Sequence, residues 1–294
     1  MFNPENIALL IPTRDRPQKL RDLLKSISEQ DLRPGQILVV ASGEDVGTVV
    51  QEFKTLSIEY HHVSFSGQVA QRNFGLKKLK ENVTLVSCMD DDMVLKPKAL
   101  SNMLEFWNKN PDYTAICYNI CNDKPFRLNI FKYLFQMTGT KPGQVTRAGY
   151  NTRITCVTQD IETDWVMGGF TVWKRKILEA HPYEREPQAY AFNEDLYYSY
   201  PLRKKFGFEF AVCEGAKVEH HHVQLTGRKN MAFGELQVHA RFKLVRDYPA
   251  HFSIPLAYWA SLGQMLENIS RFFLERDLGY LKIALGNLKG IIQT

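Results

Sequence analysis

Apolar runs alternate with segments of helical spacing over the first 90 residues, and this alternation limits the folds open to the chain. Strands are expected at 7–11, 36–41 and 83–89. Leucines at helical spacing cover 18–30, and a second helix-like segment covers 68–80. Strands that alternate with helices pair in parallel and carry helices on both faces of the sheet. The pattern therefore predicts an α/β fold on a parallel sheet.

Polar residues follow each expected strand. The first strand leads into Pro12-Thr13-Arg14-Asp15-Arg16, the second into Ser42-Gly43-Glu44-Asp45, and the third into Asp90-Asp91-Asp92. Ligands of parallel sheets bind at the carboxyl ends of the strands. We therefore expect the two arginines and the three adjacent aspartates to converge on one edge of the sheet.

The three consecutive aspartates are the first candidate site. Their carboxylates repel one another unless a cation or solvent compensates the charge. Alternation along an extended strand would put Asp90 and Asp92 on one side, where both can approach a hard ion such as Mg²⁺ or Mn²⁺. A solvated loop after a strand is the alternative interpretation.

Three further patterns each have a structural alternative. Gly168-Gly169 permits close approach of a ligand to the backbone, or forms a plain β-bulge. Glu194-Asp195 suits catalysis, or caps the first turn of a helix. The three histidines at 220–222 suit an oxygen-rich Mn²⁺ site or a decorated surface, and their spacing argues against zinc.

Composition bounds the class of protein. Hydrophobic residues make up 44% of the 294 residues and charged residues 23%, which is typical of a globular chain. The formal charge of +5 is too small to predict a nucleic-acid partner, but it suits a nucleotide or a membrane surface. Five scattered cysteines indicate a reducing compartment, the cytoplasm. We expect neither a signal peptide nor a membrane-spanning helix.

Taken in order, the motifs resemble those of the family two inverting GT-A glycosyltransferases, over about residues 6–228. The resemblance rests on the loop Pro12-Thr13-Arg14-Asp15-Arg16, the signature Arg72-Asn73-Phe74-Gly75, the DxD element Asp90-Asp91-Asp92, Gly168-Gly169 followed by Lys174-Arg175, the pair Glu194-Asp195, and Val218-Glu219-His220.

The resemblance implies a GT-A catalytic domain over 1–232, with a Rossmann-like mixed sheet flanked by helices, and a helical extension over 233–294. It implies a Mn²⁺ or Mg²⁺ ion held by Asp92, Asp90 and His220, with His222 as the alternative histidine. Asp195 would be the catalytic base, with Glu194 beside it. A nucleotide-diphosphate sugar would contact Pro12, Thr13, Arg14, Arg16, Ser42, Glu44, Arg72, Asn73, Asp90, Asp91, Gly168, Gly169 and Arg228.

One departure from the family concerns the nucleobase. Family members carry an acid directly after the second strand, whereas this chain has Ala41-Ser42-Gly43, with Glu44 the nearest acid. Ser42 could bind the base instead, or cap a turn. The sequence therefore leaves the nucleobase undefined.

The acceptor implied by the resemblance is a saccharide or lipid-linked saccharide of a cell-surface polysaccharide. The carboxyl-terminal helices would pack on the catalytic domain, form a homodimer or lie peripherally on the inner face of the cell membrane.

Two other functions compete with that of a glycosyltransferase. A nucleotidyltransferase lacks support because no glycine-rich, lysine-containing loop follows the first strand. A non-catalytic nucleotide-sugar-binding subunit would not need the base.

Overall fold

Two compact units make up the chain in the computed structural model, which describes residues 1–183, 193–221 and 229–294. The first unit comprises Met1–Pro125, Ile154–Ala189 and Leu202–His222. The second comprises Phe126–Arg153, Tyr190–Pro201 and Val223–Thr294.

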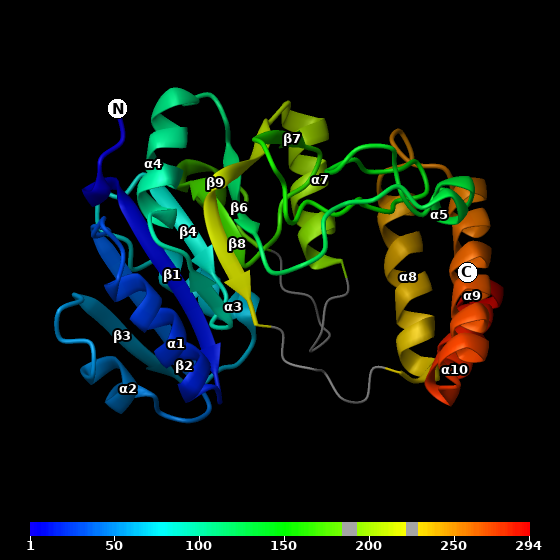
Figure 1. Cartoon of the computed structure of the whole chain (residues 1–294), viewed down its shortest axis with the longest axis horizontal. Helices are drawn as coiled ribbons and strands as arrows, with labels where there is room; N and C mark the ends of the chain where they lie inside the picture. Colours follow the sequence, from blue (N-terminus) through cyan, green and yellow to red (C-terminus); the bar gives the residue numbers. More distant parts are fainter. Residues whose placement is uncertain (184–192, 222–228) are drawn as a thin grey trace. The chain divides into compact units, whose positions relative to one another are not determined.

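A nine-stranded mixed sheet forms the centre of the first unit (Figure 1). Its strands follow the order β3-β2-β1-β4-β8-β6-β9-β5, with β7 also paired to β9. The pairs among β1 to β4 are parallel, as the sequence predicts, whereas β8 is antiparallel to both β4 and β6. The strands are β1 (Ile7–Arg14), β2 (Gln36–Ser42), β3 (Ile58–Val63), β4 (Leu85–Met89), β5 (Met93–Leu95), β6 (Ala115–Ile120), β7 (Ile161–Thr163), β8 (Phe170–Lys174) and β9 (Phe210–His220).

Helices of the first unit pack their apolar residues on the strands. Helix α1 buries Leu20, Leu23, Leu24 and Ile27, and α3 packs on β1 and β2. Gly75 explains the close approach of α3, because a Cβ there would lie 2.1 Å from Leu10 Cδ1. The helices are η1 (Pro4–Asn6, a 3₁₀ turn), α1 (Pro17–Ser28), α2 (Gly47–Gln51), α3 (Gln68–Leu76), α4 (Ala99–Lys109) and α6 (Arg175–Ala180).

The first strand is longer than its apolar run predicts. β1 continues through Pro12 to Arg14, paired with β2 along this whole stretch. Its pairing with β4 stops at Leu10, so Pro12 lies beyond the two-sided part of the strand. Thr13 therefore remains part of β1 at its carboxyl end, next to the residues that follow β4.

Helices dominate the second unit. It contains α5 (Ile130–Leu134), the first eight residues of α7 (Glu194–Phe206), α8 (Met231–Asp247), α9 (Ile254–Glu275) and α10 (Leu278–Gln293). Small residues let α10 approach α8, since a Cβ on Gly286 would lie 2.0 Å from the Met231 carbonyl oxygen. In the described part of the chain, no helix combines the length and the apolar character needed to cross a bilayer.

Candidate active site

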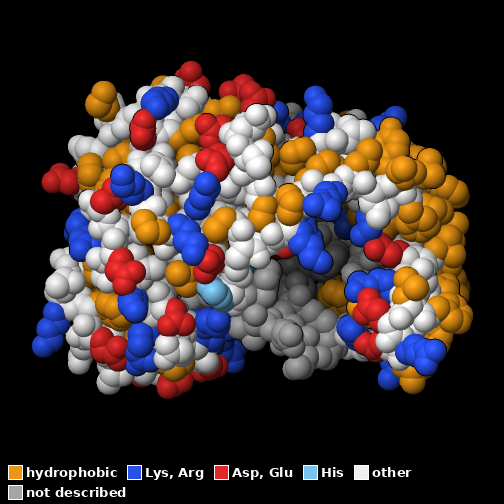
Figure 2. All heavy atoms as spheres, in the orientation of Figure 1, with side chains coloured by type: hydrophobic (Ala, Val, Ile, Leu, Met, Phe, Trp, Pro, Cys, Tyr) orange, Lys and Arg blue, Asp and Glu red, His pale blue; other side chains and the backbone are white. Residues whose placement is uncertain are grey.

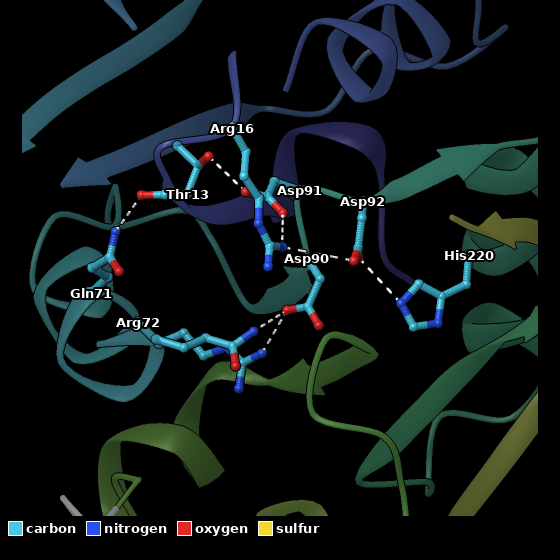
Figure 3. A network of polar contacts seen from close by, with 9 residues as sticks. Thr13, Arg16, Gln71, Arg72, Asp90, Asp91, Asp92 and His220 are labelled. Carbon is cyan, nitrogen blue, oxygen red and sulfur yellow. Dashed lines mark hydrogen bonds and ion pairs between the residues drawn. The ribbon is translucent and has the colours of Figure 1, made fainter. Parts of the chain in front are cut away.

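Asp91 joins the ends of β1 and β4. The residue is 4% exposed; its Oδ2 accepts a hydrogen bond from Thr13 Oγ1 at 2.7 Å, and its Oδ1 accepts one from Arg16 Nη1 at 3.0 Å (Figure 3). Burial raises the pKa of Asp91, and the bonds from Thr13 and Arg16 oppose that rise. Both oxygens are engaged, so Asp91 fixes the geometry of the cluster from inside the protein.

Asp90 lies against α3. Its Oδ1 accepts hydrogen bonds from Arg72 Nη2 at 2.9 Å and from Gln68 Nε2. Arg72 is 1% exposed, and its guanidinium lies over the Tyr183 ring, 5.4 Å from the centroid. The signature arginine of α3 thus holds one aspartate of the DxD element from a buried position.

The glycine pair lies against the same aspartate. The Asp90 N–H donates to the Gly169 carbonyl oxygen at 3.0 Å, and a Cβ on Gly169 would lie 2.0 Å from Asp90 Cγ. In this structure the group that approaches the glycine backbone is the Asp90 side chain.

Asp92 faces His220. Its Oδ1 lies 3.2 Å from His220 Nε2, and both side chains are largely buried. The pairing of β5 with β9 places His220 opposite Met93, and the His221 N–H donates to the Asp92 carbonyl oxygen at 2.8 Å. Asn122 and His220 exchange two further hydrogen bonds through the His220 backbone. The late Val-x-His motif and the DxD element are therefore neighbours.

The aspartates occupy a turn between β4 and β5, so the expected strand alternation of Asp90 and Asp92 is wrong. A turn breaks the two-residue periodicity, and the carboxylates of Asp90 and Asp92 consequently have different partners. Among residues 1–183, 193–221 and 229–294, no three His, Cys, Asp or Glu side chains form a metal-ligand group. The structure brings together two of the three expected ligands.

The Asp92–His220 pair fits a divalent ion. Two neighbouring donors of an octahedral ion at about 2.1 Å lie about 3.0 Å apart, close to the 3.2 Å between Asp92 Oδ1 and His220 Nε2. A carboxylate oxygen and an imidazole nitrogen suit Mn²⁺, and the oxygen also suits Mg²⁺. Arg16 Nη1 lies 3.8 Å from the other Asp92 oxygen and adds positive charge beside it.

Two glutamines of α3 belong to the site although the sequence analysis did not select them. Gln71 is buried, and its Nε2 donates to the carbonyl oxygens of Thr13 at 2.8 Å and of Val40 at 2.7 Å. It thereby links the ends of β1 and β2. Gln68 contacts Asp90. The sequence signal that could have identified them is their spacing: the two glutamines lie three positions apart on the expected helix, just before the Arg-Asn signature.

The other expected contacts of the donor vary in exposure. Arg14 is exposed and pairs with Asp15, whose Oδ1 accepts a hydrogen bond from the Glu44 N–H at 2.8 Å. Ser42 ends β2 with a buried hydroxyl that has no hydrogen-bond partner within the described ranges.

Asn73 and Pro12 have contacts within the first unit. Asn73 Nδ2 donates to the Tyr183 carbonyl oxygen at 2.8 Å, and Pro12 is buried within β1. Two expected residues, Arg228 and the alternative ligand His222, lie outside the described residues.

Glu194 and Asp195 begin α7 and belong to the second unit. Ser199 Oγ donates to the Asp195 carbonyl oxygen at 2.6 Å. One turn along, Tyr197 contacts Asp247 on α8, and Lys243 Nζ donates to the Tyr197 hydroxyl at 2.5 Å. Burial and Asp247 raise the pKa of Tyr197 to about 12, so it is a neutral donor that holds α7 on α8.

Comparison with known proteins identifies relatives over most of the chain. The model of the family described as glycosyl transferase family 2 matches residues 8–198. The O-antigen chain rhamnosyltransferase RfbN of Salmonella typhimurium is 20% identical over 223 residues, which are 74% of this chain. The matched region is 66% of RfbN, just under two thirds of its length.

Solved structures share the fold at low sequence identity. The mannosyltransferase PcManGT from Pyrobaculum calidifontis, solved with GDP-Man and Mn²⁺, has a TM-score of 0.58 at 14% identity and covers 100% of this chain and 89% of its own. A structure of TarS from S. aureus has a TM-score of 0.57 at 15% identity, covering 98% and 80%. The mixed sheet flanked by helices, with helices α8 to α10 at the carboxyl end, confirms the expected fold class.

The contact between Thr13 and Asp91 gives a prediction for stability. Thr13→Val removes the donor to a buried carboxylate oxygen, so the free energy of unfolding at pH 7.5 should fall by about 1–3 kcal/mol. Losing a partner of the charged form raises the folded-state pKa of Asp91 further above its unfolded value. The loss should therefore shrink as pH falls through that pKa, where folded Asp91 is protonated.

Urea denaturation of the full chain at pH 7.5 and pH 5 measures both effects. Thr13→Ser keeps the hydroxyl and serves as the control, with little expected change. A Thr13→Val loss that grows toward low pH would contradict this account of Asp91.

Proposed function

The chain belongs to glycosyl transferase family 2, and we propose that it is a metal-dependent inverting enzyme using a nucleotide-diphosphate sugar. In this proposal the sugar passes to a hydroxyl of a saccharide or lipid-linked saccharide during synthesis of a cell-surface polysaccharide. The observation that carries the proposal is the 3.2 Å distance between Asp92 Oδ1 and His220 Nε2, beside the buried and hydrogen-bonded carboxylate of Asp91. The relative RfbN, named as an O-antigen chain rhamnosyltransferase, supports this choice of acceptor class.

The donor diphosphate would lie beside Asp92, His220 and Arg16. Asp92 and His220 would hold Mn²⁺ or Mg²⁺, which supplies Lewis-acid stabilisation of the leaving diphosphate. Arg16 is partly exposed, and its ion pair with Asp91 fixes the guanidinium at this edge of the sheet. It would therefore add a second positive charge beside the diphosphate. The Mn²⁺ and GDP-Man named for PcManGT are consistent with this arrangement.

The nucleobase would contact the end of β2. Ser42 has a buried hydroxyl with no hydrogen-bond partner in the described part of the chain, which supports a role as a base ligand. Glu44 lies close by in the exposed loop that Asp15 holds. We retain Arg14, Asn73, Arg228 and the glycine pair as donor-site residues in the proposal.

Inversion needs one carboxylate to take the acceptor proton. Asp195 would accept that proton while the acceptor oxygen bonds to the anomeric carbon and the bond to the diphosphate breaks. Its place in the first turn of α7 next to Glu194 gives two candidate acids on one short segment. The catalytic domain in this proposal is 1–232, and 233–294 is a helical extension.

The helices of the second unit carry a large exposed apolar face. Figure 2 shows hydrophobic side chains gathered over α9. Its aromatic residues Tyr258 and Trp259 are of the kind that settle at membrane interfaces. Arg271 on α9, Lys282 on α10 and Arg276 between the two helices suit anionic lipid. We define the apolar face as Ile254, Tyr258, Trp259, Leu262, Leu266, Phe273, Leu274, Leu278, Leu285, Leu288 and Ile292.

We propose that this apolar face binds the inner face of the cell membrane, where a lipid-linked acceptor is presented. The five cysteines are free thiols, in keeping with a cytoplasmic enzyme. The alternative is that the same helices form the interface of a homodimer.

Removing either proposed metal ligand should uncouple donor binding from the ion. Asp92→Asn and His220→Gln should each raise the Mn²⁺ concentration needed for nucleoside-diphosphate binding by about 10-fold or more. A thermal-shift titration of Mn²⁺ at fixed UDP or GDP measures this. His221→Gln changes the neighbouring exposed histidine and should leave the titration unchanged, so an equal effect there would contradict the assignment.

The base assignment predicts a separation of binding from turnover. Asp195→Asn should lower kcat by about 10²–10⁴-fold and leave metal-dependent donor binding within about 2-fold. Glu194→Gln, on the adjacent residue, should have a much smaller effect on kcat. Undiminished turnover of Asp195→Asn would remove Asp195 from this role, and an inactive wild type with normal donor binding would favour a binding subunit.

Charge placed on the apolar face should prevent membrane binding. Burying Phe273 or Leu274 contributes about 1.5–3 kcal/mol, so the double change to Glu should weaken binding to phosphatidylglycerol vesicles by more than about 10-fold. Co-sedimentation measures the bound fraction. Phe206→Glu alters an exposed phenylalanine of the first unit and should change nothing. Loss of a dimer with vesicle binding unchanged would identify the face as a subunit interface.

A further inference from the structure

A pocket of about 410 Å³ lies within the second unit, among helices α5, α8, α9 and α10. Its volume is in the range of small-molecule sites. Its lining combines one carboxylate, Glu267, with four cations and two tyrosines: Lys132, Lys229, Arg241, Arg271, Tyr150 and Tyr280. This pocket is separate from the aspartate cluster, whose residues all belong to the first unit.

Arg241 is the unusual member of this lining. It is 4% exposed, and its guanidinium stacks on the Tyr150 ring, 3.8 Å from the centroid. Nη1 donates to the Gly149 carbonyl oxygen, and the Asn193 amide, turned with its oxygen toward Arg241, accepts from Nη1 and Nη2 at 3.2 and 3.1 Å. Nε has no hydrogen-bond partner within the described ranges. Burial lowers the pKa of Arg241.

The other cations of the lining already have carboxylate partners. Lys132 pairs with Glu267 at 2.9 Å, Lys229 with Asp277 at 2.6 Å, and Arg271 with Glu275 at 2.8 Å. Within the described ranges, no ion pair to a carboxylate occurs for Arg241. A buried charge without a counter-ion is strongly unfavourable, so an anion in the pocket would relieve it.

We propose that this pocket is an oxyanion site in which Arg241 binds the phosphate group of a phosphorylated saccharide. A planar guanidinium with a free Nε–H suits an oxyanion. Arg241 carries the unbalanced positive charge of the pocket, because Lys132, Lys229 and Arg271 are each paired with a carboxylate. Tyr280, whose ring has Lys229 and Arg271 within 4.3 and 4.2 Å of its centroid, supplies an aromatic surface for the sugar. The amide of Gln264 is close to the hydroxyl of Tyr150 in the same lining.

The inference deepens the proposed function, on which its link to the acceptor rests. Arg241 contacts Asn193, the residue directly before Glu194 and Asp195. A phosphate bound to Arg241 would therefore be linked through Asn193 to the segment that carries the proposed base. The phosphate could be that of a diphosphate-linked acceptor or of a free sugar phosphate, and both share this chemistry.

Direct binding of small anions to the full chain tests the site without donor, metal or turnover. We would titrate inorganic phosphate and glucose 1-phosphate by calorimetry in EDTA at constant ionic strength, in an Arg16→Gln background that weakens phosphate binding beside Asp92. Arg241→Gln should weaken phosphate binding by at least about 10-fold. Arg246→Gln, an exposed arginine on the same helix, is the matched control and should stay within about 2-fold.

A second variant keeps the test valid if Arg241→Gln fails to fold. Lys132→Glu reverses a partly exposed charge of the lining and should also weaken phosphate binding by about 10-fold, whereas Lys109→Glu makes the same charge change on α4 of the first unit and should not. Tighter binding of glucose 1-phosphate than of phosphate would identify a sugar phosphate, and equal binding a phosphate group alone.

Absence of phosphate binding, or an equal loss in the Arg246→Gln and Lys109→Glu controls, would overturn the oxyanion site while leaving the Asp92 and Asp195 results untouched. Normal phosphate binding in a chain that transfers no sugar would instead count against the proposed function alone.

Discussion

The buried carboxylate of Asp91 holds the active edge of the sheet together. Thr13 comes from β1, Arg16 from the loop after it, and Asp91 from the turn after β4, so two hydrogen bonds join segments about 75 residues apart. A buried carboxylate is tolerated when its oxygens are hydrogen-bonded and a cation lies beside it. The positions of Asp90 and Asp92 depend on this anchor, because both are adjacent to Asp91 in the same turn.

The three adjacent aspartates relieve their repulsion by taking different partners. Arg72 compensates Asp90, Arg16 compensates Asp91, and His220 faces Asp92. Two protein cations therefore do part of what the sequence analysis attributed to a metal ion. The remaining carboxylate, with an imidazole 3.2 Å away, is the member of the triplet best suited to share an ion.

The second unit is organised around polar groups as much as apolar packing. Asn287 Nδ2 donates to the Gly234 carbonyl oxygen at 2.8 Å, and Asn268 Nδ2 donates to the Asn287 side-chain oxygen at 3.0 Å. Small residues allow these close approaches, since a Cβ on Gly234 would lie 2.2 Å from the Ile283 carbonyl oxygen. Such satisfied contacts join α8 and α10. In the described part of the same unit, Arg241 Nε and Ser261 Oγ are buried without a hydrogen-bond partner.

The sequence by itself determined the parallel half of the sheet, the edge where the site forms and the family, because apolar periodicity and ordered motifs are local properties of the chain. Of the two arginines expected beside the aspartates, Arg16 lies there, since carboxyl ends of parallel strands meet at one edge, whereas Arg14 pairs with Asp15. Tertiary structure alone decided the antiparallel insertion of β8, the partner of each aspartate and the roles of Gln68 and Gln71. These depend on a turn in place of a strand and on contacts between residues distant in sequence, which no local pattern specifies.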